Sequence, residues 1–233
     1  MPISLKFWLT AARLSGWVYN WDGEPPEGVV LGRYEDPDTD SQAALVMTED
    51  RAFLVFRGTS SLKDALIDID ADFTPLGNGQ VHAGGFRAFV ALFPQLADDM
   101  GKLITQGIAV TAVGHSLGGL LAQIAGFNWQ VPVVSFGSPR AGDAAFAAEL
   151  DVEVKHARIT HEADPVPLLP PCSLGYKHSG QHAYIDSEGQ IHLNPSLVEE
   201  VLERAKGAVD GVLRDHFITN YIVALEAACQ KET

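Results

Sequence analysis

Cysteine and positively charged residues are scarce in this sequence of 233 residues. Two cysteines, Cys172 and Cys229, are too few for a disulfide framework, although they could pair with each other. Lysine and arginine number 16 against 30 aspartates and glutamates, so the formal net charge is −14. Because no basic face is available to meet phosphates, this charge argues against a nucleic acid partner and against electrostatic docking on anionic membranes.

Long hydrophobic runs are missing too, and no stretch is apolar over the length needed to cross a bilayer. Residues 1–17 are apolar, but Arg13 interrupts them and no clean cleavage site follows. We interpret this segment as an amphipathic first helix and not as a signal peptide. The interpretation favours a cytoplasmic location.

What the chain does have is enough apolar material for a full core, since 46% of its residues are hydrophobic. Its length suits one α/β domain over residues 1–233. Strand-like and helix-like segments alternate, which predicts a mostly parallel central sheet covered by helices on both faces. Strands are expected within 43–49, 51–58, 108–113, 131–139 and 151–167, with a hairpin at 182–193. Helices are expected at 84–104, bent or restarted at Pro94, and at 117–129, 195–209 and 217–230.

A single serine stands at the junction of a buried strand and a helix rich in small residues. The stretch 114–118 reads GHSLG and fits the G-x-S-x-G nucleophile elbow, a tight turn that exposes the hydroxyl of Ser116. Any side chain at Gly114 or Gly118 is expected to collide with the neighbouring strand or helix. The pentapeptide alone also fits an ordinary glycine-rich turn, and the strand before it and the helix after it favour the elbow.

A serine hydroxyl is a poor nucleophile unless a base takes its proton, so an acid and a histidine should follow in the chain. The acid should lie in a loop at the end of a later strand. Asp164 fits that position, and Glu162 is a second candidate. Because Pro165 fixes the loop and biases the preceding residue toward an extended backbone, we favour Asp164.

The base has to be one of the eight histidines. Chain order excludes the histidines that precede the acid, namely His82, His115, His156 and His161. The spacing of His178 and His182 suits a metal only on a helix, and the surrounding glycines indicate a loop. His192 lies within a hairpin strand. His216 stands where a loop meets the last helix, from which a base can reach Ser116, so we favour it.

An oxyanion hole requires backbone N–H groups that point at the tetrahedral intermediate. One donor should be Leu117, the residue after the nucleophile. The other should come from a loop after an early strand, where Gly58 allows close approach and Thr59 supplies an N–H and a hydroxyl. Viewed alone, this loop is an ordinary polar turn.

Several ordered motifs together resemble the class 3 lipase family, the filamentous-fungal lipase type of α/β-hydrolase. The matching stretches, in the family's order, are FRGTSS, VHAGGF, GHSLGG, SFGSPRAGD, HEADPVPLLPP, GYKHSG and DHFITNYIVAL. The resemblance implies Ser116 as nucleophile, Asp164 as acid and His216 as base. It also implies Thr59 and Leu117 as oxyanion-hole residues, in agreement with the residues favoured above.

The resemblance further implies a carboxylic-ester hydrolase of lipase or esterase type. Such an enzyme needs no metal or cofactor and touches a lipid interface at most transiently. Phospholipase and feruloyl-esterase activities are close alternatives, as is acyl transfer to an alcohol other than water. A catalytically silent lipid-binding module on the same fold is an alternative of another class, which a lost triad residue would favour; none is lost.

Residues 60–73 correspond to the lid of the family, and His82 and Arg140 correspond to structural motif residues near the site. One helical face of the lid would carry Leu62, Leu66, Ile69 and Phe73. The segment is strongly acidic and lacks the tryptophan that is common in lids of interfacial lipases. It therefore predicts weak action on bulk fat droplets.

Overall fold

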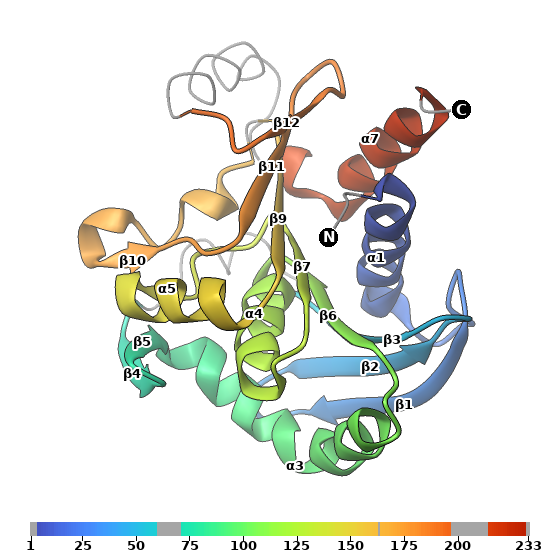
Figure 1. Cartoon of the computed structure of the whole chain (residues 1–233), viewed down its shortest axis with the longest axis vertical. Coiled ribbons are helices and arrows are strands. Elements are labelled where there is room, and N and C mark those ends of the chain that lie inside the picture. The colour runs from blue at the N-terminus through green and yellow to red at the C-terminus, as the bar shows by residue number, and fades with distance from the viewer. Residues whose placement is uncertain (1–3, 60–70, 163, 197–213, 232–233) are drawn as a thin grey trace.

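The computed structural model describes residues 4–59, 71–162, 164–196 and 214–231 (Figure 1). Its centre is an eight-stranded sheet in the order β1-β2-β3-β6-β7-β9-β11-β12. The middle strands, from β3 to β11, run parallel, whereas β1 and β2 at one end and β12 at the other are antiparallel to their neighbours. The strands are β1 (Val29–Asp36), β2 (Ser41–Met47), β3 (Ala52–Phe56), β6 (Val110–His115), β7 (Val133–Phe136), β9 (His156–His161), β11 (Gln181–Ile185) and β12 (Ile191–Leu193).

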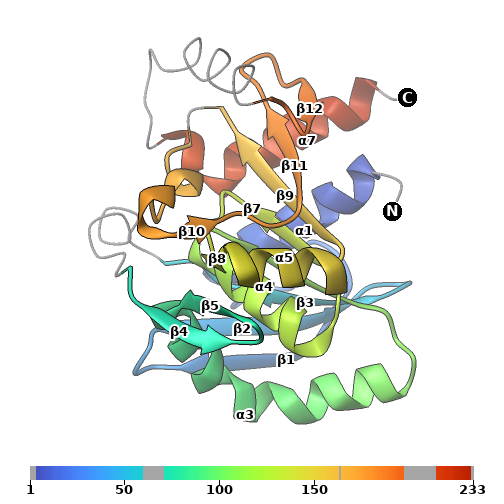
Figure 2. The ribbon, with the colours of Figure 1, turned by 60° about the vertical axis from the view of Figure 1, so that its left-hand side comes forward.

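Helices cover both faces of this sheet (Figure 2). One face packs against α3 (Ala83–Thr105), α4 (Leu117–Trp129) and α5 (Ala144–Glu153). The other packs against α1 (Leu5–Trp17) and α7 (Ile218–Lys231). The mostly parallel sheet with helices on both faces is thus confirmed, and α3 continues as one helix across Pro94, where a bend or restart was expected.

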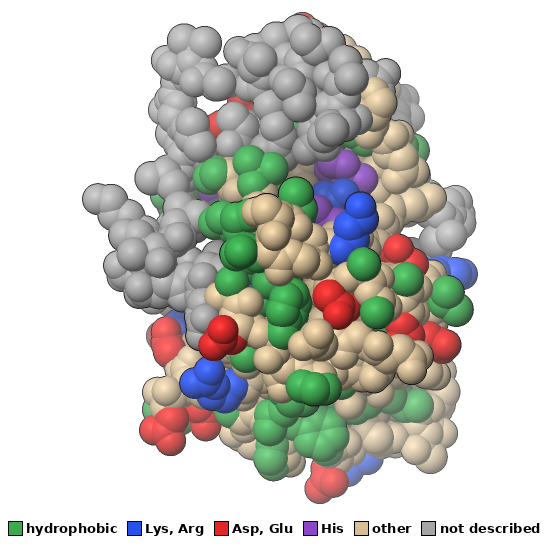
Figure 3. Space-filling model, turned by 90° about the vertical axis from the view of Figure 1, so that its left-hand side faces the viewer, with side chains coloured by type: hydrophobic (Ala, Val, Ile, Leu, Met, Phe, Trp, Pro, Cys, Tyr) green, Lys and Arg blue, Asp and Glu red, His purple; other side chains and the backbone are tan. Residues whose placement is uncertain are grey.

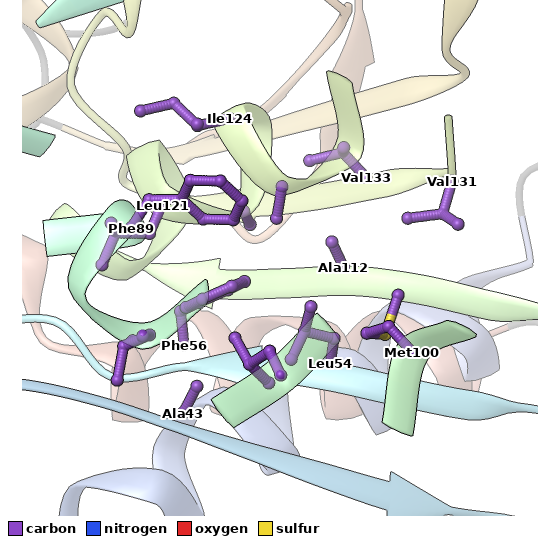
Figure 4. Packing of buried hydrophobic residues seen from close by; sticks show 14 of the residues in the cluster. Ala43, Leu54, Phe56, Phe89, Met100, Ala112, Leu121, Ile124, Val131 and Val133 are labelled. Atoms are coloured by element: carbon purple, nitrogen blue, oxygen red, sulfur yellow. The ribbon is translucent and has the colours of Figure 1, made fainter. Parts of the chain in front are cut away.

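The central strands are almost continuously hydrophobic because both of their faces are buried. Successive side chains point to opposite faces, so Leu45 and Leu54 join the core under α3 and α4, while Val46 and Val55 join the core under α1 and α7. Figure 4 shows the first of these cores, in which side chains from the sheet meet Phe89 of α3 and Leu121 of α4. This packing fixes the carboxyl end of β6, where the elbow lies.

Strand β1 and helix α5 are absent from the sequence-based prediction. An alanine-rich run forms α5, and Asp143 caps it by accepting a hydrogen bond of 2.9 Å from the N–H of Phe146. The strand expected within 151–167 therefore begins only at His156, because its first residues complete the helix.

A second, four-stranded antiparallel sheet in the order β10-β8-β5-β4 lies beside α5. Its members are β4 (Phe73–Leu76), β5 (Gly79–His82), β8 (Gly142–Asp143) and β10 (Tyr176–Lys177). Phe73 pairs with His82 and stacks on Tyr176 at 4.2 Å between ring centroids. The expectation that Phe73 belongs to a lid helix is therefore wrong, because strand pairing and stacking hold it in β4.

Some expected elements fall outside the described residues. These are most of the helix expected at 195–209 and the lid side chains of Leu62, Leu66 and Ile69. Among the helices that the structure does describe, none combines the length and hydrophobicity of a membrane span.

Candidate functional site

Ser116 occupies the sharp turn between β6 and α4. Its φ of 58° and ψ of −132° lie in a region that residues other than glycine rarely adopt. Two backbone hydrogen bonds of 2.9 Å hold this conformation: the Ser116 N–H donates to the carbonyl of Phe136 in β7, and the Ser116 carbonyl accepts from the N–H of Gly119. The fold thus maintains a strained backbone at the end of a central strand, as a nucleophile elbow requires.

The glycines on either side of Ser116 are required by space. A Cβ atom at Gly114 would collide with the backbone of Gly118. A Cβ atom at Gly118 would collide with the carbonyl of Phe56 at the end of β3. The predicted collisions at both positions are confirmed, and they allow β3, β6 and α4 to approach closely behind the serine.

Asp164 and His216 meet in the interior, although they are far apart in the sequence. Asp164 follows β9, and His216 ends a short 3₁₀ helix, Arg214–His216, just before α7. Nδ1 of His216 lies 2.9 Å from each carboxylate oxygen of Asp164, to which its N–H donates. Both side chains are almost completely buried, so the pair is shielded from water.

Two further donors hold the carboxylate of Asp164. The hydroxyl of Tyr221, on α7, donates to Oδ2 at 2.5 Å. The N–H of Val166 donates to Oδ1 at 2.9 Å. Glu162, the alternative acid, instead has its carboxylate 3.7 Å from the ring of His161. The structure therefore brings Asp164 to the histidine and leaves Glu162 outside the pair.

The other ring nitrogen of His216, Nε2, is buried and has no hydrogen-bond partner among the described residues. With Nδ1–H donated to Asp164, Nε2 carries the lone pair in the neutral ring and is free to accept a proton. The ring of His216 lies 4.5 Å from that of His115, the residue just before Ser116. The base is therefore held beside the elbow.

Gly137, in the turn after β7, lies directly against the pair of Asp164 and His216. Its φ is 52°, and a Cβ atom there would lie 2.6 Å from Oδ2 of Asp164 and 3.1 Å from Nδ1 of His216. Both the backbone conformation and the lack of space require glycine. Sequence reasoning did not identify Gly137 or Tyr221 as site residues.

The loop that carries the first expected oxyanion-hole residue runs directly past the elbow. A Cβ atom at Gly58 would lie 3.1 Å from Cβ of Ser116 and 2.6 Å from the carbonyl oxygen of His115. Thr59 follows Gly58 immediately, and Leu117 is the first residue of α4. The segments expected to supply the two N–H donors thus lie next to Ser116.

The loop after Asp164 is anchored from outside by two side chains. Arg140 donates from Nη1 to the carbonyls of Leu168, at 2.5 Å, and Pro170, at 2.8 Å. His178 Nε2 donates to the carbonyl of Pro167 at 2.7 Å, and burial holds the pKa of its ring well below the usual value. Arg140 therefore supports the acid-bearing loop, in agreement with the structural role expected for it.

The remaining histidines have structural partners. His82 caps α3 by accepting from the N–H of Gly85 at 3.0 Å, as its expected structural role requires. Nε2 of His182 lies 2.7 Å from the hydroxyl of Thr160. Over the described part of the chain, no three His, Cys, Asp or Glu side chains are grouped to hold a metal. Cys172 and Cys229, both within the described residues, are not joined by a disulfide.

Comparison with known families identifies the family to which this chain belongs. The model of the family described as Lipase (class 3) matches residues 53–174, which include the elbow and Asp164. This chain belongs to the class 3 lipase family. The family predicted from the ordered motifs is therefore confirmed.

Individual relatives of this chain come from filamentous fungi. The lipase of Rhizopus niveus is 28% identical over 184 residues, which are 70% of this chain and 46% of that protein. The secreted mono- and diacylglycerol lipase A of Penicillium cyclopium is 29% identical over 178 residues, which are 70% of this chain and 57% of that protein. The chain spans about half the length of these relatives.

A solved structure shows the same fold. The lipase of Rhizopus microsporus var. chinensis superimposes with a TM-score of 0.80 at 22% identity, covering 91% of this chain and 85% of that one. The predicted α/β-hydrolase fold is thereby confirmed. The expected cytoplasmic location is contradicted, because the Penicillium relative is named a secreted lipase. The sequence features of residues 1–17 therefore do not indicate where the protein is located.

Proposed function

We propose that this class 3 lipase is a serine carboxylic-ester hydrolase that cleaves acylglycerols or similar fatty-acyl esters at Ser116. The observation that carries the proposal is the buried pair of Asp164 and His216, whose free Nε2 lies beside the elbow. The names of the relatives, which are lipases, support the substrate class.

In the first half of the reaction, Oγ of Ser116 attacks the ester carbonyl carbon while Nε2 of His216 takes the hydroxyl proton. The N–H groups of Thr59 and Leu117 stabilise the oxyanion of the tetrahedral intermediate. The intermediate collapses, the bond to the alcohol breaks, and His216 returns the proton to the departing alcohol. Asp164 keeps the imidazole in the required tautomer and stabilises its charged form.

In the second half, water takes the place of the alcohol. His216 removes a proton from the water as its oxygen attacks the acyl carbon, and the second intermediate expels Oγ of Ser116. The proton returns to the serine, and the carboxylic acid leaves. Each step needs only the side chains and N–H groups named here.

Exposed hydrophobic side chains in the segments that follow Asp164 and His216 support an apolar substrate. Leu168 and Leu174 lie in the chain that follows Asp164, and Phe217 follows His216; about half of each side chain is accessible to solvent, at 49%, 53% and 54%. Figure 3 shows hydrophobic side chains gathered on the face that carries β4, β5 and β10. Acyl chains could contact such a surface while the ester carbonyl reaches Ser116.

The composition of residues 60–73 narrows the expected substrate. The segment is acidic and contains no tryptophan, so it provides little affinity for an anionic lipid surface. We therefore expect modest interfacial activation and a preference for short or medium acyl chains. Rates should be measured over p-nitrophenyl esters of increasing chain length, and with tributyrin through its solubility limit. A sharp rise at that limit, with long-chain triglycerides as the best substrates, would contradict this expectation.

The decisive test of the proposed function is Ser116→Ala. The variant should lose several orders of magnitude in turnover of p-nitrophenyl butyrate while its circular dichroism and unfolding transition stay unchanged. The matched control is Ser187→Ala at an exposed hairpin position, which should keep full activity. An organophosphonate should label the wild-type protein at Ser116 alone. A folded Ser116→Ala protein that retains most of its activity would refute the proposal.

A further inference from the structure

A tyrosine from the amino-terminal part of the chain lies at the junction of the loops that form the site. Tyr19 belongs to a 3₁₀ helix, Val18–Asn20, that directly follows α1. Its hydroxyl oxygen lies 2.9 Å from Nδ1 of His115 and would collide with a Cβ atom at Gly58, so the backbone of Gly58 passes directly beside it. Tyr19 thus contacts the residue before the nucleophile and the residue before Thr59.

His115 continues the chain of contacts to the base. Its Nε2 lies 2.6 Å from the backbone carbonyl of His216. A carbonyl only accepts, so His115 must carry its proton on Nε2. In the neutral ring Nδ1 is then an acceptor, and the Tyr19 hydroxyl must be its donor. The hydrogen bonds therefore run in one direction: the Tyr19 hydroxyl donates to Nδ1 of His115, and Nε2–H of His115 donates to the carbonyl of His216.

The surroundings keep both links uncharged. Burial raises the pKa of the Tyr19 hydroxyl, although Arg57 nearby opposes this. Burial lowers the pKa of the His115 ring well below its usual value, and the neighbouring His216 lowers it further. A neutral His115 places no positive charge against the His216 ring 4.5 Å away, which must itself become positive during the proposed reaction.

We propose that Tyr19 and His115 form a positioning relay that fixes the oxyanion loop and the base relative to Ser116. The relay rests on the proposed ester hydrolysis. Three segments must meet for that reaction: the loop of Gly58 and Thr59, the elbow, and the turn that ends at His216. Contacts between residues that are close in the sequence do not hold these segments together, whereas the relay connects all of them. Neither relay residue touches the substrate.

The sharpest variant is Tyr19→Phe, which removes one oxygen atom and keeps the ring. Because the neutral hydrogen bond to His115 is lost, kcat should fall about tenfold while KM changes less than about twofold. The matched control is Tyr34→Phe, which removes a buried hydroxyl bonded to Asp99 at 2.8 Å, away from the site. It should match wild-type kcat. Equal kcat values for Tyr19→Phe, Tyr34→Phe and wild type would overturn the relay.

The histidine is tested by rescue. His115→Leu removes both hydrogen bonds at similar volume and should lower kcat about 100-fold. His115→Gln keeps a side-chain N–H for the carbonyl of His216 and should recover a large part of that loss. If Gln is no better than Leu while both proteins are folded, the hydrogen bond to His216 does not position the base.

A double-mutant cycle decides whether the two residues act as one unit. Once His115 is leucine, Tyr19 has lost its acceptor, so adding Tyr19→Phe should lower kcat by less than about twofold more. Fully additive losses would refute the relay. Ser116→Ala distinguishes this failure from failure of the proposed function: activity that survives Ser116→Ala rejects ester hydrolysis at Ser116, whereas an inactive Ser116→Ala with an unaffected Tyr19→Phe rejects the relay alone.

Discussion

Tyr221 donates its hydroxyl to Asp164 at 2.5 Å from a helix that begins two residues after His216. The helix therefore supplies one donor to the carboxylate, and the turn before it supplies another. Tyr221 is fully buried, so its ring and hydroxyl have a fixed position. Asp164 is consequently held from the side of α7 as well as by the N–H of Val166.

Tyr221→Phe should lower kcat about tenfold, because a hydrogen bond to a charged group is worth about 1.5–3 kcal/mol. The ring remains, so the packing of α7 against the sheet is retained. Tyr34→Phe is again the control, since its hydroxyl also donates to a carboxylate. Steady-state kinetics and thermal unfolding on both variants separate catalysis from stability. Equal activity of the two variants would show that the Tyr221 hydroxyl does not position Asp164.

The two candidate acids can be distinguished by amide substitution. Asp164→Asn keeps the shape of the side chain but removes the charge that favours Nδ1–H on His216, so kcat should fall about 10⁴-fold. Glu162→Gln should change kcat less than about threefold, because Glu162 faces His161 and not His216. The assignment of the acid is wrong if the two variants lose similar activity.

A side chain at position 137 would crowd the pair of Asp164 and His216. Gly137→Ala places a methyl group 2.6 Å from Oδ2 of Asp164 and 3.1 Å from Nδ1 of His216, so the pair must shift. Because a displacement of about 1 Å can cost 10²-fold in rate, kcat should fall about 100-fold. Gly189→Ala is the matched control, since Gly189 also has positive φ but nothing within 4 Å of its Cβ position. It should lose some stability and keep its kcat, whereas comparable kcat losses in both variants would contradict the steric argument.

The elbow and the order of the triad could be predicted from the sequence because their signals are local. A buried strand, two glycines around a serine and a small-residue helix are consecutive, and chain order then restricts the acid and the base. The position of Asp164 before Pro165 already favours it over Glu162, and the structure shows that the carboxylate of Asp164, and not that of Glu162, lies against His216.

The elements that could not be predicted from the sequence depend on contacts between residues that are far apart in the chain. Strand β1 is an edge strand that contains Gly32 and exposes Val29, so it lacks a clean alternating pattern. Strands β8 and β10 have two residues each and exist only because they pair across the fold. The contact between Tyr19 and His115 likewise arises from the packing of α1 on the sheet, and no spacing in the sequence indicates it.

Stability should fall as the solution becomes acidic, starting below about pH 6.5. Burial lowers the pKa of His156 to about 3, and the charge of Arg158 adds to this effect. The ring lies between the hydroxyls of Ser135 and Ser179, at 2.8 and 3.1 Å. In the unfolded chain the same ring takes up a proton near pH 6.5, so the unfolded state binds more protons between pH 6.5 and 3.

Each such histidine should lower the free energy of unfolding by about 1.4 kcal/mol per pH unit over that window, and buried His115 and His178 act in the same direction. Urea unfolding should be measured between pH 7.5 and 5, above the range in which most carboxylates titrate. A glutamine at position 156 cannot take up a proton. In His156→Gln the slope of the free energy of unfolding against pH should therefore be smaller than in the wild type, by the contribution of about one proton. Parallel curves for the two proteins would show that His156 is not held neutral in the folded state.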